Sequence, residues 1–472
     1  MSDICELTAV EMARRIRARE LSARETVAAH LARIERLNPR VNAIVTLVAE
    51  QALEQAREAD DALAHGRIAG PLHGLPIAHK DLQLTRGIRT TFGSPIYRDF
   101  VPQEDSLLVE RVRRAGAIVV GKTNTPEFGA GSQTFNTVFG ATLNPYDTTK
   151  TCGGSSGGAA VALACGMLPI ADGSDMGGSL RNPASFCNVV GMRTSPGRVP
   201  VWPRILGWST LSVEGPMGRN VADAALLLSA IAGPDARSPI SLDDPGATFA
   251  EPLERDFRGV RVAWWKDLGG IPFDPRVKAS VNAQRQAFES LGCVVEEAEP
   301  DLAGADDVFK CLRGWHFSLS GDDKRPHRPL VKSTILWELD RGEKMTADQV
   351  GRAEMRRTEL YHQMRRFMER YEFFVLPVSQ VPPFDVREEY VREIAGVDMP
   401  TYIDWMKSCY YISILGNPAI SVPCGFTDGG LPVGLQIVGR HRDDRGVLEM
   451  AHAFEQAAGV ERRPPALVAS ET

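Results

Sequence analysis

Two glycine-flanked serine motifs are the part of this chain whose residue types and spacing best suit chemistry. The first, GGSSGG, covers residues 153–158, and the second, GGS, covers residues 177–179. Glycine lets backbone N–H groups approach a reacting atom closely and adopts dihedral angles that other residues avoid. A serine held in such a loop can act as a nucleophile while the surrounding N–H groups stabilise an oxyanion. On its own, a glycine-rich loop is equally compatible with a simple turn of the chain.

A lysine upstream of these motifs changes the interpretation. Lys80 ends a short apolar run, Leu75–His79, that is typical of a buried strand. Burying a charged amine is costly, so lysine is unusual at such a position. Burial would lower the pKa of Lys80 and make a neutral amine available as a base. The flanking His73 and His79 are expected to have structural or supporting roles.

Together these stretches resemble the amidase signature family of serine hydrolases. The similarity covers most of the chain and is carried by GLPIAHKD at 74–81, GKTNTPEF at 121–128, GGSSGG at 153–158, DMGGSLRNPA at 175–184, GNPAISVPCGF at 416–426 and LPVGLQIVG at 431–439. The resemblance implies a Ser–Ser–Lys triad in which Ser179 is the nucleophile, Ser155 the bridging serine and Lys80 the base. It also implies a cis peptide between Gly154 and Ser155.

The same resemblance assigns supporting roles around the triad. The oxyanion hole is expected from the backbone N–H groups of Met176, Gly177, Gly178 and Ser179. Gly154, Ser156, Asp175 and Arg181 are expected to shape the site, with Asp175 and Arg181 forming an ion pair that orients the loop. Two positions depart from the family pattern: residue 176 is often Thr, and residue 152 is often Pro. We expect Met176 to alter packing or substrate preference, and Cys152 is a weak nucleophile candidate because no His pairs with it in a motif.

Two other motif interpretations fail on the neighbouring residues. GGSSG also matches the nucleophile elbow of α/β-hydrolases, but that elbow needs a strand directly before the serine. Residues 144–150 have the composition of a loop. A phosphate-binding P-loop needs Lys followed by Ser or Thr after the glycines, where this chain has Ala159 and Ala160.

Composition excludes several classes of function. The 472 residues carry 54 basic and 60 acidic side chains, a net charge of −6, which gives no support for a nucleic-acid surface. The eight cysteines show no CxxC or zinc-ligand spacing, so we expect no metal, no cofactor and a reducing cytoplasm. The N-terminal residues show no signal-peptide pattern, and no apolar stretch approaches the ~20 residues that span a bilayer.

Periodicity predicts an α/β fold. Residues 6–66 are expected to form helices, one of them starting at a capping box of Ser22 and Glu25 and broken at Asn38 and Pro39. The strand–helix alternation after Gly74 favours a largely parallel sheet, and a further helix is expected over 277–291. We expect one large domain over 1–472, with a single large mixed sheet of many strands covered by helices on both faces. Its parts would be N-terminal helices (6–66), the signature core (67–235), an inserted helical cap (300–410) and a C-terminal return to the core (411–460).

The expected activity is hydrolysis of the C–N bond of a linear, non-peptide amide with a small or medium-sized, apolar or aromatic acyl group. Aromatic residues of the cap, together with Trp202 and Trp208, favour such a substrate. A carbamate or ester hydrolase (a urethanase), the amidase subunit of a glutamine-dependent tRNA amidotransferase, and a catalytically inactive binding protein are the alternatives. Expected partners are a small amide and water, with no nucleic acid and no membrane; the sequence leaves the oligomeric state open, a homodimer included.

Overall fold

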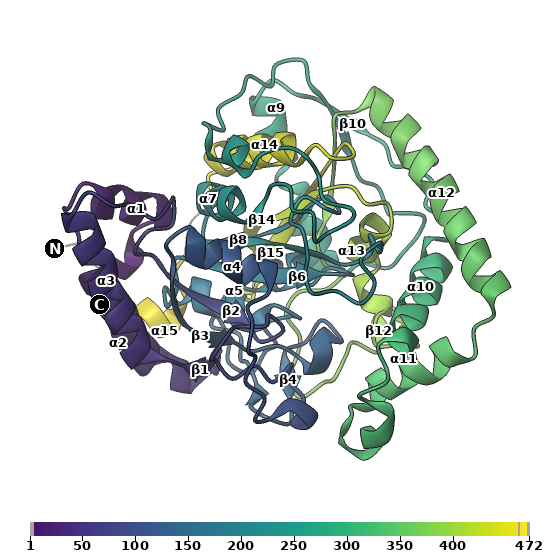
Figure 1. The fold of residues 1–472 in the computed structure, drawn as a ribbon. Coiled ribbons are helices and arrows are strands. Elements are labelled where there is room, and N and C mark those ends of the chain that lie inside the picture. The colour runs from purple at the N-terminus through teal and green to yellow at the C-terminus, as the bar shows by residue number, and fades with distance from the viewer. Residues whose placement is uncertain (1–3, 461–462, 470–472) are drawn as a thin grey trace.

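The computed structural model describes residues 4–460 and 463–469, and its centre is an eight-stranded mixed sheet (Figure 1). Its strands, in spatial order, are β10 (Val294–Glu297), β9 (Arg261–Trp264), β11 (Phe373–Pro377), β15 (Pro432–Gly439), β14 (Ala419–Phe426), β7 (Val190–Arg193), β8 (Val213–Gly218) and β6 (Ile170–Asp175). The mixed sheet expected from the sequence is confirmed.

The expectation of largely parallel pairing is wrong. Only β10–β9 and β9–β11 pair in parallel, whereas the other five neighbouring pairs are antiparallel. The hairpin β14–β15 accounts for three of these pairs, because it occupies the middle of the sheet and pairs antiparallel with β11 and with β7. Strand β8 adds the other two, since it runs antiparallel to both β7 and β6. The alternation of helices and strands along the chain does not reveal this late insertion.

Lys80 lies outside the large sheet, in a separate three-stranded one. That sheet has the order β1 (Ile44–Leu47), β3 (Ile118–Thr123), β2 (Pro76–Lys80), and β2 runs parallel to β3. Every residue of β2 is buried, in agreement with its apolar run. Two short hairpins complete the strands: β4 (Phe135–Asn136) with β5 (Gly140–Ala141), and β12 (Glu393–Ile394) with β13 (Val397–Asp398).

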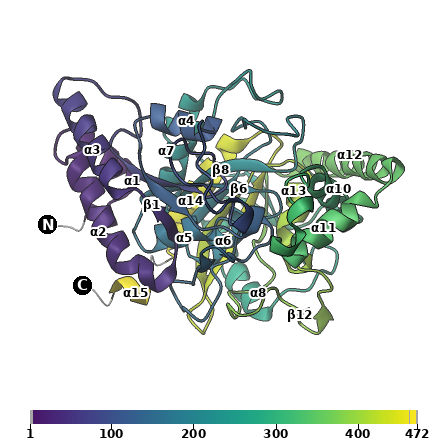
Figure 2. The ribbon, with the colours of Figure 1, turned by 60° about the horizontal axis from the view of Figure 1, so that its bottom comes forward.

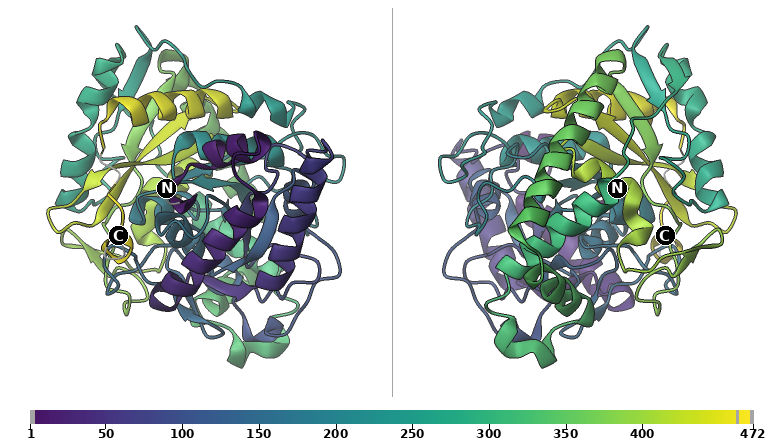
Figure 3. Two further views of the ribbon diagram at one scale, coloured as in Figure 1. Left: turned by 90° about the vertical axis from the view of Figure 1, so that its left-hand side faces the viewer. Right: turned by 90° about the vertical axis from the view of Figure 1, so that its right-hand side faces the viewer.

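Three N-terminal helices cover one side of the molecule, as Figure 3 shows in its left view. They are α1 (Ala9–Arg17), α2 (Ala23–Val41) and α3 (Ala49–Ala64). Ser22 and Glu25 form the expected capping box at the start of α2. Pro39 does not break α2, because it lies in the last turn of the helix. A proline there removes only one helical hydrogen bond, and the helix ends two residues later, at Val41. Strand β1 also interrupts the stretch expected to be purely helical.

Further helices pack around the two sheets. They are α4 (Leu107–Arg114), α5 (Gly157–Ala164), α6 (Arg181–Phe186), α7 (Val221–Ile231), α8 (Pro275–Asn282), α9 (Arg285–Ser290), α14 (Asp444–Ala457) and α15 (Ala466–Ala469). The single helix expected over 277–291 is divided into α8 and α9. The small residues of α5 have a packing reason: a Cβ at Gly158 would lie 2.3 Å from the backbone nitrogen of Asn124.

A helical layer covers the opposite side from the N-terminal helices (Figures 2 and 3). It contains α10 (Ala305–Leu319), α11 (Ser333–Glu343) and α12 (Ala347–Arg370), and α13 (Lys407–Ser413) lies beneath it. Strand β11, between α12 and α13, belongs to the central sheet, so residues 300–410 are not helical throughout. Short 3-10 helices lie at Ile4–Glu6, Pro95–Tyr97, Glu127–Gly129, Gly246–Ala250, Arg325–Leu330 and Asp404–Met406. Within the described part of the chain, no helix has both the length and the apolar character needed to span a bilayer.

Candidate active site

The side chain of Lys80 ends in a cluster of serine hydroxyls. Its Nζ lies 2.7 Å from Ser155 Oγ, 2.9 Å from Ser156 Oγ and 3.1 Å from Ser174 Oγ. Lys80, Ser155 and Ser156 are buried. The sequence pointed to the first two serines, whereas Ser174, at the end of β6, is recognisable only once β6 is placed beside β2.

Burial lowers the pKa of Lys80 to about 7, although the carboxylates of Asp172, Asp175 and Glu214 act in the opposite direction. Asp172 is the largest of these opposing influences and also accepts the Lys80 backbone N–H at 3.1 Å. The second Asp172 oxygen lies 2.5 Å from Nδ1 of His79, and both side chains are fully buried. His79 therefore holds a carboxylate beside the lysine, which is the supporting role expected of it.

The loop that carries Ser155 is held by side chains from the preceding segment. Ser132 Oγ donates to the Gly154 carbonyl and Thr134 Oγ1 donates to the Gly153 carbonyl, both at 2.8 Å. The Gly154–Ser155 peptide is cis, as the family resemblance implied. A Cβ at Gly154 would lie 2.9 Å from the backbone nitrogen of Gln133, so only glycine fits this packing.

Ser179 lies on the second glycine-flanked loop, close to the first. The Ser156 N–H donates to the Ser179 carbonyl at 3.1 Å, which ties the two loops together. Ser155, Ser174 and Ser179 line one cavity of about 120 Å³. Ser179 is partly exposed to this cavity, and a Cβ at Gly177 would lie 2.8 Å from the ring of Phe309 on α10. The helical layer thus closes over the loop.

A buried ion pair fixes the shape of the Ser179 loop. Asp175 accepts Nε of Arg181 at 3.0 Å and Nη2 at 2.9 Å, and it also accepts the N–H groups of Gly178 and Leu180. Burial alone would raise the pKa of Asp175, but the guanidinium groups of Arg181 and Arg193 outweigh burial and hold the pKa well below its ordinary value. Arg193, 3.3 Å from Asp175, was not identified from the sequence.

Arg181→Met is expected to lower the free energy of unfolding by roughly 3–5 kcal/mol, because it leaves Asp175 buried with only the more distant Arg193. Urea unfolding followed by circular dichroism measures this loss. Arg352→Met, which removes an exposed ion pair with Asp348, is the control and should change stability by about 0–1 kcal/mol. Equal losses for the two variants would contradict the role assigned to Asp175–Arg181.

Three other residues that could be mistaken for catalytic groups have different surroundings. Lys122 is also buried, but its Nζ donates to the Gln83 carbonyl and to the hydroxyls of Thr85 and Thr90. Burial raises the pKa of the Cys152 thiol to about 12, so this side chain stays protonated at neutral pH. The His73 ring contacts the Ala59 carbonyl and not a serine.

The cavity beside Ser179 is lined by five apolar side chains and four serines, with Arg313 as its one charged member. The apolar side chains are those of Leu82, Phe128, Met176, Phe317 and Met406. Neither tryptophan of the 199–211 loop lines this cavity. Trp208 is 78% exposed, and Trp202 stacks with Arg237 at 5.2 Å. The apolar character expected of the site is therefore supplied by other residues than the two tryptophans.

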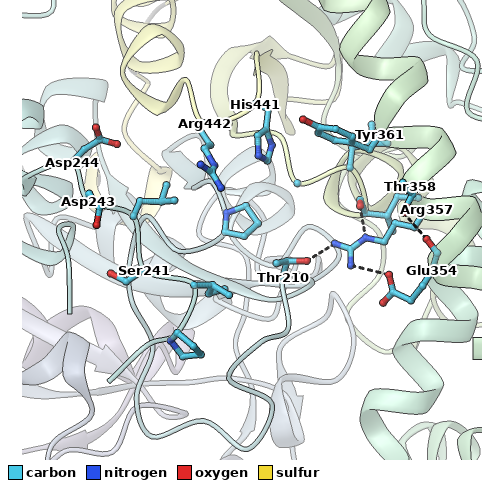
Figure 4. A pocket seen from close by; sticks show the side chains of 17 residues that line it. Thr210, Ser241, Asp243, Asp244, Glu354, Arg357, Thr358, Tyr361, His441 and Arg442 are labelled. Carbon is cyan, nitrogen blue, oxygen red and sulfur yellow. Dashed lines mark hydrogen bonds and ion pairs between the residues drawn. The ribbon is translucent and has the colours of Figure 1, made fainter. Parts of the chain in front are cut away.

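A larger cavity of about 690 Å³, drawn in Figure 4, is lined by none of the triad residues. Thr210 lines this larger cavity, whereas Ser212, two residues later, lines the small one. Arg357 of α12 holds the separating segment by donating to Thr210 Oγ1 at 2.7 Å (Figure 4). Size alone therefore does not locate the chemistry in this molecule.

The mixed α/β fold and the serine–lysine cluster define a hydrolase that acts on C–N bonds. The Amidase family model matches residues 25–448, and the chain belongs to this family, whose members hydrolyse amides. An acylamidase of Rhodococcus erythropolis is 36% identical over 456 residues, 95% of each chain. A glutamyl-tRNA(Gln) amidotransferase subunit of Moorella thermoacetica is 37% identical over 493 residues, 98% of each chain. The structure of a bacterial aryl acylamidase of the amidase signature family superposes with a TM-score of 0.90 at 28% identity, covering 96% of each chain.

Proposed function

We propose that this protein is a free-standing amidase that cleaves a small or medium-sized acyl amide through an acyl-enzyme on Ser179. The observation that carries the proposal is the 2.7 Å contact between Lys80 Nζ and Ser155 Oγ, beside a cavity that Ser155 and Ser179 both line. A lysine whose pKa is lowered to about 7 by burial can hold and release a proton near neutral pH.

In the proposed mechanism, neutral Lys80 takes the proton of Ser155 while Ser155 takes that of Ser179. The Ser179 alkoxide attacks the amide carbonyl and forms a tetrahedral oxyanion. The relay then returns the proton to the leaving nitrogen, and the C–N bond breaks to give the amine and the acyl-enzyme. Water, deprotonated by the same relay, attacks the ester, and the acid leaves as Ser179 regains its proton.

The oxyanion would be stabilised by backbone N–H groups of the Ser179 loop. Of the four expected groups, the Gly178 N–H already donates to Asp175 Oδ1 at 2.9 Å. The proposed donors are therefore the N–H groups of Met176, Gly177 and Ser179. Fixed donors in a water-poor site stabilise developing charge strongly, because they need no reorganisation during the reaction.

The substrate preference follows from the cavity wall. A small space lined by Leu82, Phe128, Phe317 and Met406 favours an apolar or aromatic group next to the scissile bond. The similarity to an acylamidase and to an aryl acylamidase supports a linear, non-peptide amide. A carbamate or ester is the alternative within the same mechanism, because the same attack on the carbonyl serves a C–O bond.

A matched substrate panel tests this function. The purified chain is assayed with a 4-nitroanilide, an aliphatic amide, a phenyl carbamate and a nitrophenyl ester that share one acyl group. The proposal expects hydrolysis of the anilide, and loss of this activity in Ser179→Ala. Turnover of the carbamate and ester without the amides would instead assign the protein as a urethanase, and no turnover of any of them would contradict the enzymatic proposal.

The amidotransferase subunit is a second candidate because the Moorella thermoacetica protein matches 98% of this chain. It would act with partner subunits and use glutamine. Glutaminase activity, or copurification of partner proteins from the source cell, would support this candidate, whereas efficient anilide hydrolysis by the chain alone supports the free-standing amidase. We propose the cytoplasm as its location, in keeping with the scattered cysteines, and size-exclusion chromatography with light scattering decides between monomer and homodimer.

A further inference from the structure

Helix α10 brings a buried guanidinium to the wall of the active-site cavity. Arg313 is 5% exposed and lines the same cavity as Met176 and Ser179. Its Nε donates to Glu338 Oε1 and its Nη2 donates to the Tyr402 hydroxyl, each at 2.7 Å. Glu338 on α11 and Tyr402 before α13 therefore hold the guanidinium in one orientation.

The third nitrogen of Arg313 is poorly satisfied. Its Nη1 donates to Sδ of Met176 at 3.2 Å, and a thioether is only a weak acceptor. Across residues 4–460 and 463–469, the structure gives Nη1 no oxygen acceptor. Apolar side chains of Phe317, Phe128, Leu82 and Met406 line the cavity beside it. The serine hydroxyls of the same cavity make no hydrogen bond to Nη1. A buried donor without a full partner is costly, so a substrate atom that accepts this N–H would gain binding energy.

Arg313 already pairs with one buried carboxylate. Glu338 is fully buried, accepts from Arg313, and also accepts the Tyr402 hydroxyl at 2.8 Å. The second Glu338 oxygen lies 3.1 Å from Arg341, whose side chain is partly exposed. A further carboxylate at Nη1 would have to be desolvated close to the buried Glu338 carboxylate, whereas an uncharged oxygen avoids this cost.

We propose that Arg313 determines specificity by donating from Nη1 to a second, uncharged oxygen in the acyl part of the substrate, such as a ketone or an ether. The inference rests on the proposed function, in which Ser179 attacks the acyl carbonyl in this cavity. Met176 takes part in this recognition, because its sulfur accepts the Nη1 hydrogen bond when no substrate oxygen is bound. The amidase would therefore prefer oxygenated acyl chains to hydrocarbon chains of the same shape.

Acyl 4-nitroanilides of matched shape test this preference. The 4-oxopentanoyl, 4-methylpentanoyl and succinyl anilides share one branched skeleton, with a ketone, a methyl group or a carboxylate at the branch. Methoxyacetyl and butanoyl anilides form a shorter pair. In the wild type, at least one neutral oxygenated compound should exceed its hydrocarbon match in kcat/KM by roughly tenfold or more, because a pocket built around a hydrogen bond rejects an analogue that lacks it. The succinyl compound should be slower than the 4-oxopentanoyl compound.

Variants identify Arg313 as the origin of the preference. Arg313→Met should bring the two members of a pair within about threefold, chiefly by slowing the oxygenated member, as expected when one specific hydrogen bond is lost. The double variant Arg313→Met with Glu338→Gln avoids a buried unpaired carboxylate and keeps the test valid if the single variant does not fold. Arg341→Met is the matched control: Arg341 pairs with the same Glu338 and stacks on Trp337 at 4.5 Å, but it does not line the cavity. In Arg341→Met, the ratio of kcat/KM between the two members of each pair should match that of the wild type.

Equal kcat/KM values for both members of each pair in the wild type would overturn the inference, as would a preference that survives in the double variant. Faster hydrolysis of the succinyl anilide would show recognition of an anion and would also overturn it. Failure of the wild type to hydrolyse any of the five anilides would contradict the proposed function itself, so the two failures are distinguishable.

Discussion

Ser179→Ala is expected to lower kcat by roughly 10⁴-fold or more, because it removes the attacking oxygen from a site that is otherwise complete. The fold should survive. Ser179 is partly exposed to the cavity and its backbone carbonyl still accepts the Ser156 N–H, so the melting temperature should stay within a few degrees of the wild type. Steady-state kinetics with an anilide and a thermal melt measure the two quantities.

Covalent labelling gives the same prediction an independent readout. A fluorophosphonate should modify Ser179 in the wild type, and the Ser179→Ala protein should remain unlabelled. In Ser155→Ala the label should still be on Ser179, formed more slowly because the proton relay is interrupted. Peptide mass spectrometry locates the adduct. An adduct on Ser155 or on Cys152 in the wild type would reassign the nucleophile.

The second large effect concerns Lys80. The rate should rise with pH through about 7, since Lys80 accepts a proton only when it is neutral and burial lowers its pKa to about that value. Lys80→Arg should lose about 10²–10⁴-fold in kcat/KM, because a guanidinium stays protonated and cannot act as a base. Lys80→Met should lose a similar amount. A pH–rate profile from pH 5 to 9 measures the position of the rising limb.

Neighbouring titratable groups provide the controls. Asp172→Asn removes the carboxylate that most strongly raises the pKa of Lys80, so the rising limb should move to lower pH. Burial also raises the pKa of Glu214 to about 7. If Lys80 is the origin of the rising limb, Glu214→Gln should retain the limb and move it to lower pH, because Glu214 also raises the pKa of Lys80. Lys122→Met, which removes a second buried lysine that contacts no serine, should keep it as well. An active Lys80→Arg enzyme with an unchanged profile would mean that lysine only holds the serines in place.

The local features of this chain were readable from the sequence. The buried strand β2 was predicted from its apolar run, and the start of α2 from the Ser22–Glu25 capping box. The glycines at 154 and 177 already indicated a close backbone approach at these positions. The structure shows which neighbouring atoms a Cβ would meet there. Such features depend on residues within a few positions of each other, so periodicity and turn-forming residue types are enough to predict them.

Pairings between distant segments were decided only by the tertiary structure. The sequence did not reveal that β2 lies in a separate sheet, that most strands of the large sheet are antiparallel, or that α2 continues through Pro39. Strand direction depends on which strand becomes the neighbour. The hairpin β14–β15, more than 200 residues after β7, takes the central place in the sheet, where every residue of β15 and most residues of β14 are buried.

The candidate site also combines features that were predictable from the sequence with features that only the tertiary structure shows. The sequence by itself determined which residue types are present, a lysine at the end of a buried strand and serines between glycines, and the family resemblance assigned their order. Only the fold placed Ser174 and Asp172 around Lys80, Arg193 beside Asp175, and Arg313 from a helix more than 130 residues away against Met176. A pKa and a binding preference depend on burial and on the charges nearby, and both are properties of packed segments that no single stretch of sequence contains.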